Sequence, residues 1–210
     1  MEFLMESGMF RVAALLIGYI LGNVQTSYLF GRMFRGTDIR DHGSGNAGTS
    51  NTIRTFGAGV GALVFAVDVL KAVAAFALCM YIFGGVHGLI PGVYAGAGVV
   101  LGHNFPAIMG FRGGKGIAST IGVMICVVDW QMALILVVLG LALLFGTKMV
   151  SVASLALTLA FPVLLLTFGY AAEVVAVSAL LTVLAWVLHR GNIRRILAGD
   201  ERKLSLGKGG

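Results

Sequence analysis

The sequence has 210 residues, of which 58% are hydrophobic and only 11% are charged. An ordinary soluble domain carries about a quarter charged residues, so this composition excludes a soluble globular fold of this size. The net charge of +6 would suit a nucleic-acid partner in a soluble protein, but here the basic residues lie between or after apolar runs, as in the loops of a membrane protein.

The apolar runs contain almost no ionisable side chains, and a membrane-spanning helix needs about 20 such residues. They are continuously apolar rather than alternating, which indicates helices rather than the strands of a barrel. We therefore predict an all-α, polytopic membrane protein with seven transmembrane helices. In chain order, the predicted spans are residues 9–30, 58–83, 89–109, 116–128, 130–145, 149–168 and 174–188.

The fourth predicted span, residues 116–128, is short. It extends only about 20 Å along a helix axis, whereas the hydrocarbon core is about 30 Å thick. We expect it to be recessed from the cytoplasmic face, so that the preceding loop borders a cavity lined by protein or water.

The basic residues are concentrated in alternate connecting segments, which the positive-inside rule places in the cytoplasm. The pattern predicts an amino terminus outside and a carboxyl terminus in the cytoplasm. We expect one membrane domain over residues 1–210 with a short basic cytoplasmic tail at 198–210, and no removable signal peptide, since no basic residue precedes the first run. The basic residues that follow the pattern are Arg32, Arg35, Arg40, Arg54, Arg112, Lys115, Lys148, Arg190, Arg194, Arg195, Arg202, Lys203 and Lys208.

The first predicted cytoplasmic loop is rich in glycine and small polar side chains. Glycines let successive backbone N–H groups turn inward, and hydroxyl and amide side chains add donors, so the segment suits an oxyanion. A flexible linker is the alternative, but amides and an arginine set among glycines favour a binding loop. The candidate residues are Ser44, Gly45, Asn46, Thr49, Asn51 and Arg54.

The third predicted cytoplasmic segment covers residues 102–106 and 111–120, and three of its glycines flank Lys115 directly before a predicted helix. A helix amino terminus presents unpaired N–H groups and a partial positive charge. We predict a phosphate site here; the alternative is a lysine that only anchors a helix end at the headgroups. It is not a nucleotide P-loop, because the Gly-x4-Gly-Lys-Ser/Thr spacing is absent. The candidate residues are His103, Asn104, Arg112, Gly113, Gly114, Lys115 and Gly116.

Two pairs of polar residues lie three positions apart at other predicted helices. On a helix that continues past the last span, His189 and Asn192 share one face, which we expect to point into the site. For the arginines of residues 190–195, contact with anionic lipid is the favoured interpretation. Asp68 and Lys71 lie within an apolar span and are predicted to form an intramembrane ion pair that neutralises itself or touches substrate.

The sequence offers no metal-binding pattern. Its four histidines lack helical partners at His-Glu-x-x-His or Glu-x-x-His spacing. The His-x4-Asp signature of the large family of membrane glycerolipid acyltransferases is absent as well. We therefore expect no metal and no cofactor, and no residue stands out as a general base.

Three segments resemble known motifs, in order along the chain. They closely resemble the three cytoplasmic motifs of the bacterial acyl-phosphate:glycerol-3-phosphate acyltransferases, the PlsY family, and the Asp68-Val69-Leu70-Lys71 segment also resembles that family's pattern. Arg112 departs from the motif, which usually has lysine there; a planar guanidinium differs from an ammonium, so its exact contact is not carried over. The segments are residues 43–51, residues 102–106 with 111–116, and the pattern His189-x-x-Asn192-Ile193-Arg194-Arg195.

The resemblance implies a metal-independent enzyme of the bacterial plasma (inner) membrane with its site on the cytoplasmic face. It would transfer an acyl chain from acyl-phosphate to the 1-hydroxyl of glycerol 3-phosphate, giving 1-acylglycerol 3-phosphate and phosphate without an acyl-enzyme. The donor's own phosphate would take the acceptor's proton. The residues that match substrate-binding positions are Ser44, Arg54, Lys115, His189 and Asn192, with Asn46 and residues 113–116 shaping the cradle.

Two rival interpretations come from other classes of protein. An anion or phosphate-ester transporter would also place basic groups beside broken helices, but no inverted repeat is present and the polar residues gather on one face. An intramembrane serine protease using Ser44 and His189 fits the Gly-Ser-Gly sequence, but Ser44 lies in a loop rich in anion donors, outside any span.

Overall fold

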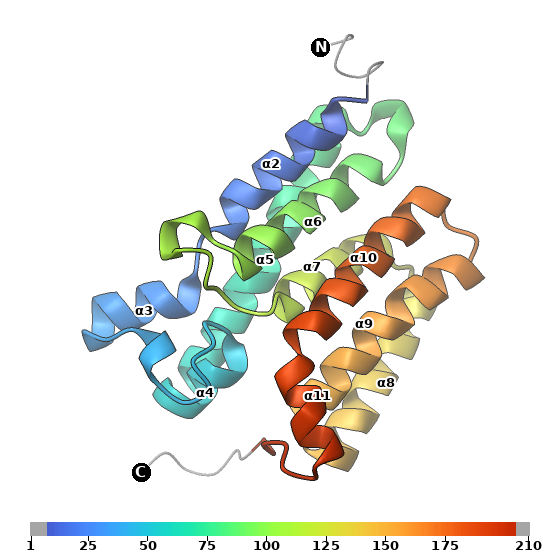
Figure 1. Cartoon of the computed structure of the whole chain (residues 1–210). Helices are drawn as coiled ribbons and strands as arrows, with labels where there is room; N and C mark the ends of the chain where they lie inside the picture. The colour runs from blue at the N-terminus through green and yellow to red at the C-terminus, as the bar shows by residue number, and fades with distance from the viewer. Residues whose placement is uncertain (1–7, 205–210) are drawn as a thin grey trace. The chain divides into compact units, whose positions relative to one another are not determined.

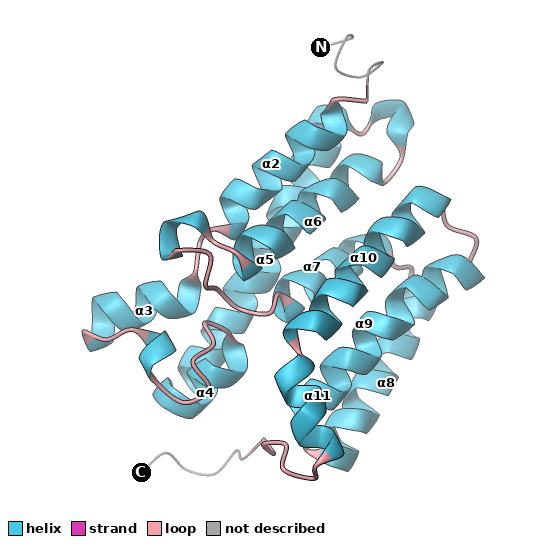
Figure 2. Cartoon of the chain, in the orientation of Figure 1, coloured by secondary structure: helices cyan, strands magenta, loops and turns pink. Residues whose placement is uncertain are grey.

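The computed structural model describes residues 8–204, which contain helices and no β-strand (Figures 1 and 2). This confirms the all-α prediction. Glu2, Glu6 and Lys208, used in the orientation argument, lie outside the described residues. The chain forms two compact units, Met1–Val127 and Val128–Gly210. That both serve one functional domain stays a prediction.

The described part of the first unit contains one long α-helix of 26 residues and five shorter α-helices that contact it. In residues 8–127 the α-helices are α2 (Phe10–Gly22), α3 (Thr26–Arg35), α4 (Thr49–Phe56), α5 (Ala58–Phe83), α6 (Ile90–Asn104) and α7 (Ile117–Val127). Three single 3-10 turns, η1 (Ile39–Asp41), η2 (Gly85–His87) and η3 (Ala107–Met109), lie in the connections.

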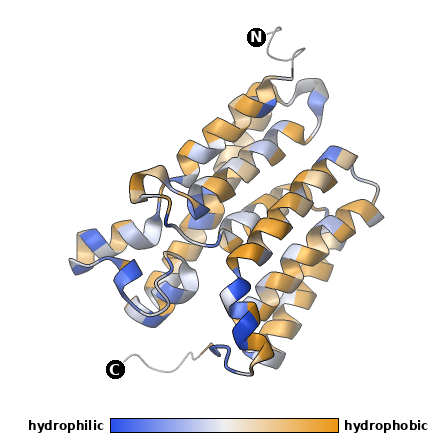
Figure 3. Cartoon of the chain, in the orientation of Figure 1, coloured by the Kyte–Doolittle hydropathy of each residue, from blue (hydrophilic) through white to orange (hydrophobic). Residues whose placement is uncertain are grey.

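The second unit contains α8 (Trp130–Thr147), α9 (Val150–Thr167), α10 (Ala172–Leu188) and α11 (Arg190–Leu197). Helix α9 packs against both α8 and α10. The chain bends by 62° between α10 and α11. Hydrophilic residues are concentrated on α11 and the segment that follows it, whereas the other three helices are mostly apolar (Figure 3).

Several of these helices are long and apolar enough to cross a membrane. Four segments of the described chain qualify outright, and α10 with α11 makes a fifth if the bent pair is one span. Helix α7 is a shorter apolar helix. The protein therefore has several apolar helices of membrane-spanning length, while the full count of seven stays a prediction. The four segments are Phe10–Arg35, Ala58–Phe83, Trp130–Thr147 and Val150–Thr167.

Glycines bring α2 and α6 into direct backbone contact. A Cβ atom at Gly18 or Gly22 would collide with the backbone of α6, and one at Gly98 or Gly102 would collide with the backbone of α2. Lipid gives helices no hydrophobic reason to associate, so close packing over small residues is a main source of their attraction. The contact fixes the carboxyl end of α6, from which the glycine-rich segment departs.

The first predicted span is not one continuous helix, which corrects the expectation for residues 9–30. Helix α2 ends at Gly22, and Gln25 has a non-helical backbone before α3 begins. The break is stabilised by side chains: Asn23 Nδ2 donates to the Tyr19 carbonyl (2.7 Å), and Gln25 Nε2 donates to the carbonyls of Gly22 (3.2 Å) and His103 (3.1 Å). At the break, backbone carbonyls therefore accept hydrogen bonds from a buried side-chain amide.

Three further boundaries differ from the sequence expectation. Helix α6 ends at Asn104 instead of continuing to 109, since Pro106 cannot donate to the helix. Residues 49–56, expected as loop, form α4. The helix does not continue straight through residue 189, because the bend between α10 and α11 falls there. The expectation of one continuous helix is therefore wrong, and the shared face of His189 and Asn192 stays a prediction.

Candidate functional site

The first and third polar segments meet within the first unit. Ile39, Ala47 and Met109 form a small buried apolar cluster between them. Arg40 adds a polar link, because its Nη1 donates to the carbonyls of Met109 (3.0 Å) and Arg112 (3.4 Å). The side chain of Arg40 thus connects the first predicted cytoplasmic loop to the backbone that follows α6.

Arg40 is itself held by Asp38. Its Nη2 lies 2.8 Å from Asp38 Oδ2, and its Nε donates to Oδ1 at 3.1 Å. These hydrogen bonds hold the pKa of the Asp38 carboxyl below its ordinary value. A planar guanidinium can bind a carboxylate and two carbonyls together, which a lysine ammonium cannot do with the same geometry.

The side chain of Asn51 binds the backbone of the first loop. Its side chain is buried, its Nδ2 donates to the carbonyls of Ile39 (3.1 Å) and His42 (3.0 Å), and its Oδ1 accepts from the Ser44 N–H (2.7 Å). With its amide occupied by loop backbone, Asn51 shapes the loop that carries Ser44. This role differs from direct anion contact, for which the sequence singled it out.

Other candidates of the first segment lie around the start of α4. Ser44 is exposed between Gly43 and Gly45, both of which have positive φ angles that glycine adopts readily. Thr49 opens α4, and its Oγ1 is buried without a hydrogen-bond partner in the described chain. Arg54 is exposed in the last turn of α4.

Asn46 lies beside the same turn. An added Cβ at Gly48 would come within 2.8 Å of Asn46 Oδ1, so the asparagine amide lies over this glycine. The glycine precedes α4 and has an extended backbone. The small residue therefore leaves space for the amide at the amino terminus of α4.

The glycines of the third segment are required by close packing on the end of α6. Gly113 N–H donates to the Asn104 carbonyl (3.2 Å), and Gly114 N–H donates to the His103 carbonyl (3.0 Å). A Cβ at Gly113 would collide with the His103 carbonyl, and one at Gly114 would collide with the His103 ring. The residues Gly113 to Gly116 are called the glycine loop below.

The glycine loop leads directly into α7, with Lys115 two residues before Ile117. Gly116 has a φ of +75°, and a Cβ there would come within 2.6 Å of Asn104 Oδ1. Both polar atoms of the Asn104 side-chain amide are buried without a hydrogen-bond partner in residues 8–204. An unsatisfied buried amide against a glycine loop is a candidate ligand contact, since such groups normally have partners.

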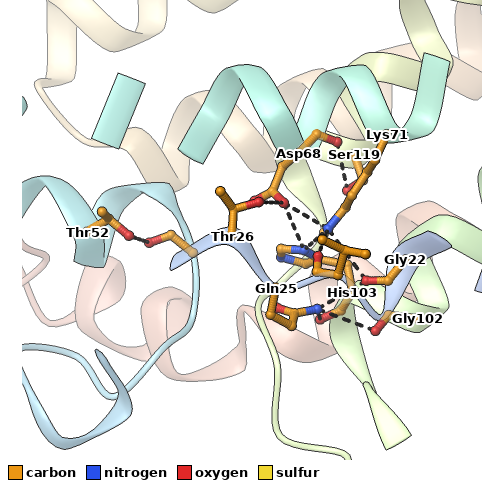
Figure 4. Close-up of polar contacts among 12 residues, drawn as sticks. Gly22, Gln25, Thr26, Thr52, Asp68, Lys71, Gly102, His103 and Ser119 are labelled. Atoms are coloured by element: carbon orange, nitrogen blue, oxygen red, sulfur yellow. Dashed lines mark hydrogen bonds and ion pairs between the residues drawn. The ribbon is translucent and has the colours of Figure 1, made fainter. Parts of the chain in front are cut away.

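The predicted intramembrane pair is present and belongs to a larger buried cluster (Figure 4). Lys71 Nζ lies 2.8 Å from Asp68 Oδ1 and 2.9 Å from His103 Nδ1. It also donates to the Val24 carbonyl at 2.8 Å, at the break between α2 and α3. The pair therefore connects α5 to the last turn of α6, on which the glycine loop packs.

In the second unit, His189 lies at the bend between α10 and α11. Its side chain is buried, and its Nδ1 is 2.7 Å from the Ala185 carbonyl one turn earlier. A carbonyl can only accept, so Nδ1 carries a proton in this arrangement. The bend directs α11 away from the axis of α10 immediately after this residue.

Asn192 is held by Glu201. Its Nδ2 donates to Glu201 Oε1 at 2.6 Å, and the same oxygen accepts from Ser151 Oγ at 2.8 Å. Arg195 Nε donates to Oε2 at 2.8 Å. Burial alone would raise the pKa of the Glu201 carboxyl, but these donors outweigh it and the pKa is lowered.

The chain after α11 folds back on the second unit. The Leu204 N–H donates to the Lys148 carbonyl at 2.6 Å, in the connection between α8 and α9. This part of the predicted basic tail is thus a strap that carries Glu201 to α11 and α9. Residues 205–210 of the predicted tail lie outside the described residues.

Comparison with known proteins decides the family. The profile of the family described as glycerol-3-phosphate acyltransferase matches residues 12–199. A glycerol-3-phosphate acyltransferase of Thermoanaerobacter sp. (strain X514) is 40% identical over 196 residues, covering 93% of this chain and 96% of the relative. The chain belongs to the glycerol-3-phosphate acyltransferase family.

Solved structures agree with this acyltransferase assignment. The chain resembles the crystal structure of PlsY, an integral membrane glycerol 3-phosphate acyltransferase, in its glycerol 3-phosphate form, with a TM-score of 0.84 and 31% identity. The lysophosphatidic acid form of PlsY gives a TM-score of 0.81. Each comparison covers 93% of this chain and 96% of the PlsY chain. The resemblance to the PlsY family stated from sequence motifs is confirmed.

Two supporting contacts of the acyltransferase were missed from the sequence. Glu201 was treated as part of a basic tail, although carboxylates among cations, here Asp200 and Glu201, are the kind of residues that pair with them. Arg40 gave a weaker signal, because two of its partners are backbone carbonyls some 70 positions later. Long-range backbone partners have no signature in the local sequence.

The candidate site of the acyltransferase is suited to binding anions. Its described residues supply loop N–H groups, hydroxyls, amides and cations, while no group of three His, Cys, Asp or Glu residues in 8–204 is placed to hold a metal ion. Donors held in fixed positions stabilise developing negative charge without reorganising. Such a set can bind phosphate and an acyl oxyanion.

Proposed function

We propose that this acyltransferase transfers an acyl group from acyl-phosphate to the 1-hydroxyl of glycerol 3-phosphate. The products are 1-acylglycerol 3-phosphate, that is lysophosphatidic acid, and inorganic phosphate. The observation that carries the proposal is the glycine loop, which packs on the end of α6 and brings Lys115 to the start of α7. A helix start with fixed N–H groups and a cation is suited to phosphate.

The chemistry needs no nucleophile from the protein. The acceptor hydroxyl oxygen attacks the carbonyl carbon of acyl-phosphate, the bond from that carbon to the phosphate oxygen breaks, and the departing phosphate takes the hydroxyl proton. An acyl-phosphate is already activated, so the protein must mainly position the hydroxyl and stabilise charge on the carbonyl oxygen and the phosphate. No metal and no acyl-enzyme is part of this scheme.

We assign substrate contacts to residues of both units. Those of the first unit are Ser44, Arg54 and Lys115, and those of the second are His189 and Asn192. The supporting cradle consists of Gly45, Asn46, Thr49, Asn51, His103, Asn104, Arg112, Gly113, Gly114 and Gly116. The burial of unpartnered polar atoms in Thr49 and Asn104 supports a ligand between these segments of the first unit.

The scheme requires that the substrate-contact residues of the first unit and those of the second unit bind the same substrate. Single-cysteine variants at Lys115 and Asn192, labelled with a thiol reagent with and without glycerol 3-phosphate, test this. Protection of both cysteines by the same concentration of substrate is expected. Protection of one and not the other contradicts a shared site.

We further propose seven spans in a bacterial plasma membrane, with the amino terminus outside and the site on the cytoplasmic face. The distribution of basic residues between alternate connections supports this orientation. Labelling of cysteines introduced at Arg54 and at Gly169 in sealed inside-out vesicles by a membrane-impermeant reagent tests it. Reaction at position 54 and not at 169 is expected, and the reverse contradicts the orientation.

Turnover is tested with the purified protein. Glycerol 3-phosphate is mixed with either acyl-phosphate or acyl-coenzyme A, and lysophosphatidate and free phosphate are measured. The proposal expects both products in equal amounts with acyl-phosphate. Product from acyl-coenzyme A alone would contradict the donor assignment, and uptake of glycerol 3-phosphate into proteoliposomes without acylation would favour a transporter.

A further inference from the structure

Figure 4 shows a buried polar cluster in the first unit. The cluster borders the glycine loop, because a Cβ added at Gly114 would collide with the ring of His103, one of its members. Asp68, Lys71 and His103 are 1%, 9% and 3% exposed. The first two come from α5, and the histidine comes from the last turn of α6. Ionisable residues at such depth in a membrane protein are expensive to bury and usually mark function.

The contacts of Lys71 determine how His103 is protonated. An ammonium has three donors and no acceptor. Its nearest partners are three: Asp68 Oδ1 and the Val24 carbonyl at 2.8 Å each, and His103 Nδ1 at 2.9 Å. His103 Nδ1 must therefore accept, and the ring proton of the neutral imidazole lies on Nε2.

The alternative partner for this ring nitrogen is less favourable. Asp68 Oδ1 is 3.6 Å from His103 Nδ1, which is too long for a hydrogen bond. Asp68 is occupied instead by Lys71, with Thr26 Oγ1 donating to it at 3.4 Å. The carboxylate thus acts on the imidazole through the ammonium.

The protonated edge of the imidazole is directed at the glycine loop. A Cβ added at Gly114 would collide with His103 Nε2. The backbone at the same place is already tied to this residue, since the Gly114 N–H donates to the His103 carbonyl at 3.0 Å. That carbonyl also accepts from Gln25 Nε2 at 3.1 Å. The ring and backbone of His103 together form the floor of the loop.

We propose that Asp68 and Lys71 are positioning residues that hold His103 in its Nε2-protonated tautomer, with that N–H facing the glycine loop at Gly114. The loop would then present a fixed donor edge and a fixed backbone to a bound phosphate group. This inference rests on the proposed function for the identity of the ligand, but its protonation statement does not. The pair itself need not touch substrate.

A purely structural role does not explain the arrangement as well. Replacing a buried ion pair by apolar residues is often neutral or stabilising, so such a pair is a weak source of stability. An apolar pair could not select one imidazole tautomer. Outer partners that fix the orientation and tautomer of a histidine commonly have large effects on the site it serves.

The tautomer is tested directly by nitrogen NMR of the full-length protein labelled at its four histidines. The resonances of His103 are assigned with His103→Gln. The wild type is expected to show His103 with a proton on Nε2 only. In Lys71→Met the proton is expected to move to Nδ1, toward the Asp68 carboxylate. A wild-type Nδ1–H form, or an unchanged tautomer in Lys71→Met, would overturn the proposal.

Two further variants serve as controls for misfolding. Asp68→Asn with Lys71→Met leaves no buried charge unpaired, and the same move of the proton to Nδ1 is expected if Lys71→Met alone does not purify as folded protein. Ser119→Ala removes a hydrogen bond of 3.2 Å to the Asp68 carbonyl without touching Lys71 or His103. It is expected to keep the wild-type tautomer and turnover.

A double-mutant cycle tests the link to the loop. Lys71→Met is expected to lower kcat/KM about 10-fold to 100-fold, the scale of a small misplacement at a site. His103→Gln retains an N–H donor that has no tautomer to select, so adding Lys71→Met to it should change kcat/KM by less than about twofold. Full additivity would overturn the positioning role.

The two proposals fail separately. Absence of lysophosphatidate from wild-type protein with every donor contradicts the proposed function, and the tautomer measurement still decides whether the pair fixes His103. If the wild type turns over normally but the effects of Lys71→Met and His103→Gln on kcat/KM are additive, only the positioning role of Asp68 and Lys71 is contradicted.

Discussion

The side-chain amide of Asn192 donates a 2.6 Å hydrogen bond to the buried carboxylate of Glu201, nine residues later on the strap that follows α11. The same carboxylate accepts from Ser151 on α9 and from Arg195 on α11. A residue assigned to substrate binding is thus oriented by a group from the end of the described chain.

Replacing Glu201 by glutamine should destabilise the second unit and misplace Asn192. Glutamine offers one acceptor oxygen where the carboxylate offers two, and hydrogen bonds to charged groups contribute about 2 kcal/mol each. We expect a lower Tm in detergent and a loss of kcat/KM of at least about tenfold. Asp200→Asn, a change at the adjacent exposed carboxylate, serves as the control and should leave both quantities unchanged.

The same contact gives a pH dependence. Because the pKa of Glu201 is lowered in the folded protein, its stabilising contribution is complete above the ordinary glutamate pKa and is lost as the pH falls through the folded value. The Tm difference between wild type and Glu201→Gln should therefore be largest near about pH 7 and shrink toward about pH 3. A difference that grows with acid would rule out the ionised carboxylate as the stabilising form.

Removing a proposed phosphate-binding cation should reduce turnover with little effect on folding. Loss of one electrostatic donor at a reacting centre typically lowers the rate about 100-fold to 1,000-fold. We expect losses of this order or larger for Lys115→Ala and for Arg54→Ala. Lys203→Ala and Arg202→Ala, at exposed cations of the strap, are the matched controls. Normal turnover by purified, folded Lys115→Ala and Arg54→Ala would refute the site assignment.

An alanine at Gly114 should displace the glycine loop. Its Cβ would collide with the His103 ring, which is held in place by Lys71 and by its own backbone. We expect a higher KM for glycerol 3-phosphate or a lower kcat, by about 10-fold or more. Gly59→Ala is a suitable control, because nothing lies within 4 Å of its added Cβ and alanine favours α5. Equal kinetics for the two variants would show that the loop tolerates displacement.

Arg40→Lys should loosen the link between the first and third segments. Lysine keeps the charge but cannot bind the Asp38 carboxylate and the Met109 and Arg112 carbonyls with one planar fork. We expect kcat/KM to fall about tenfold while the protein stays folded. Arg35→Lys, at an exposed arginine on α3, should have no effect. If the two lysine variants behave alike, the guanidinium geometry at residue 40 is not needed.

The sequence by itself determined that the chain is a helical membrane protein and which residue types are candidates for the site. Long apolar runs can satisfy their backbone only as helices in lipid, and this property is local to each run. The glycines around Lys115, the amides of the first segment and the pair Asp68–Lys71 could be selected in the same way, because their residue types already limit what they can bind. The family assignment follows from these residues.

Tertiary structure decided how the selected residues are held. The break at Gln25 depends on the His103 carbonyl, the glycine loop depends on the end of α6, and Asn192 depends on Glu201. The bend at His189 and the helix over residues 49–56 likewise escaped the sequence analysis. Each of these contacts joins segments whose partners are chosen by packing, and helix periodicity carries no information about which distant carbonyl or carboxylate will lie within hydrogen-bond distance.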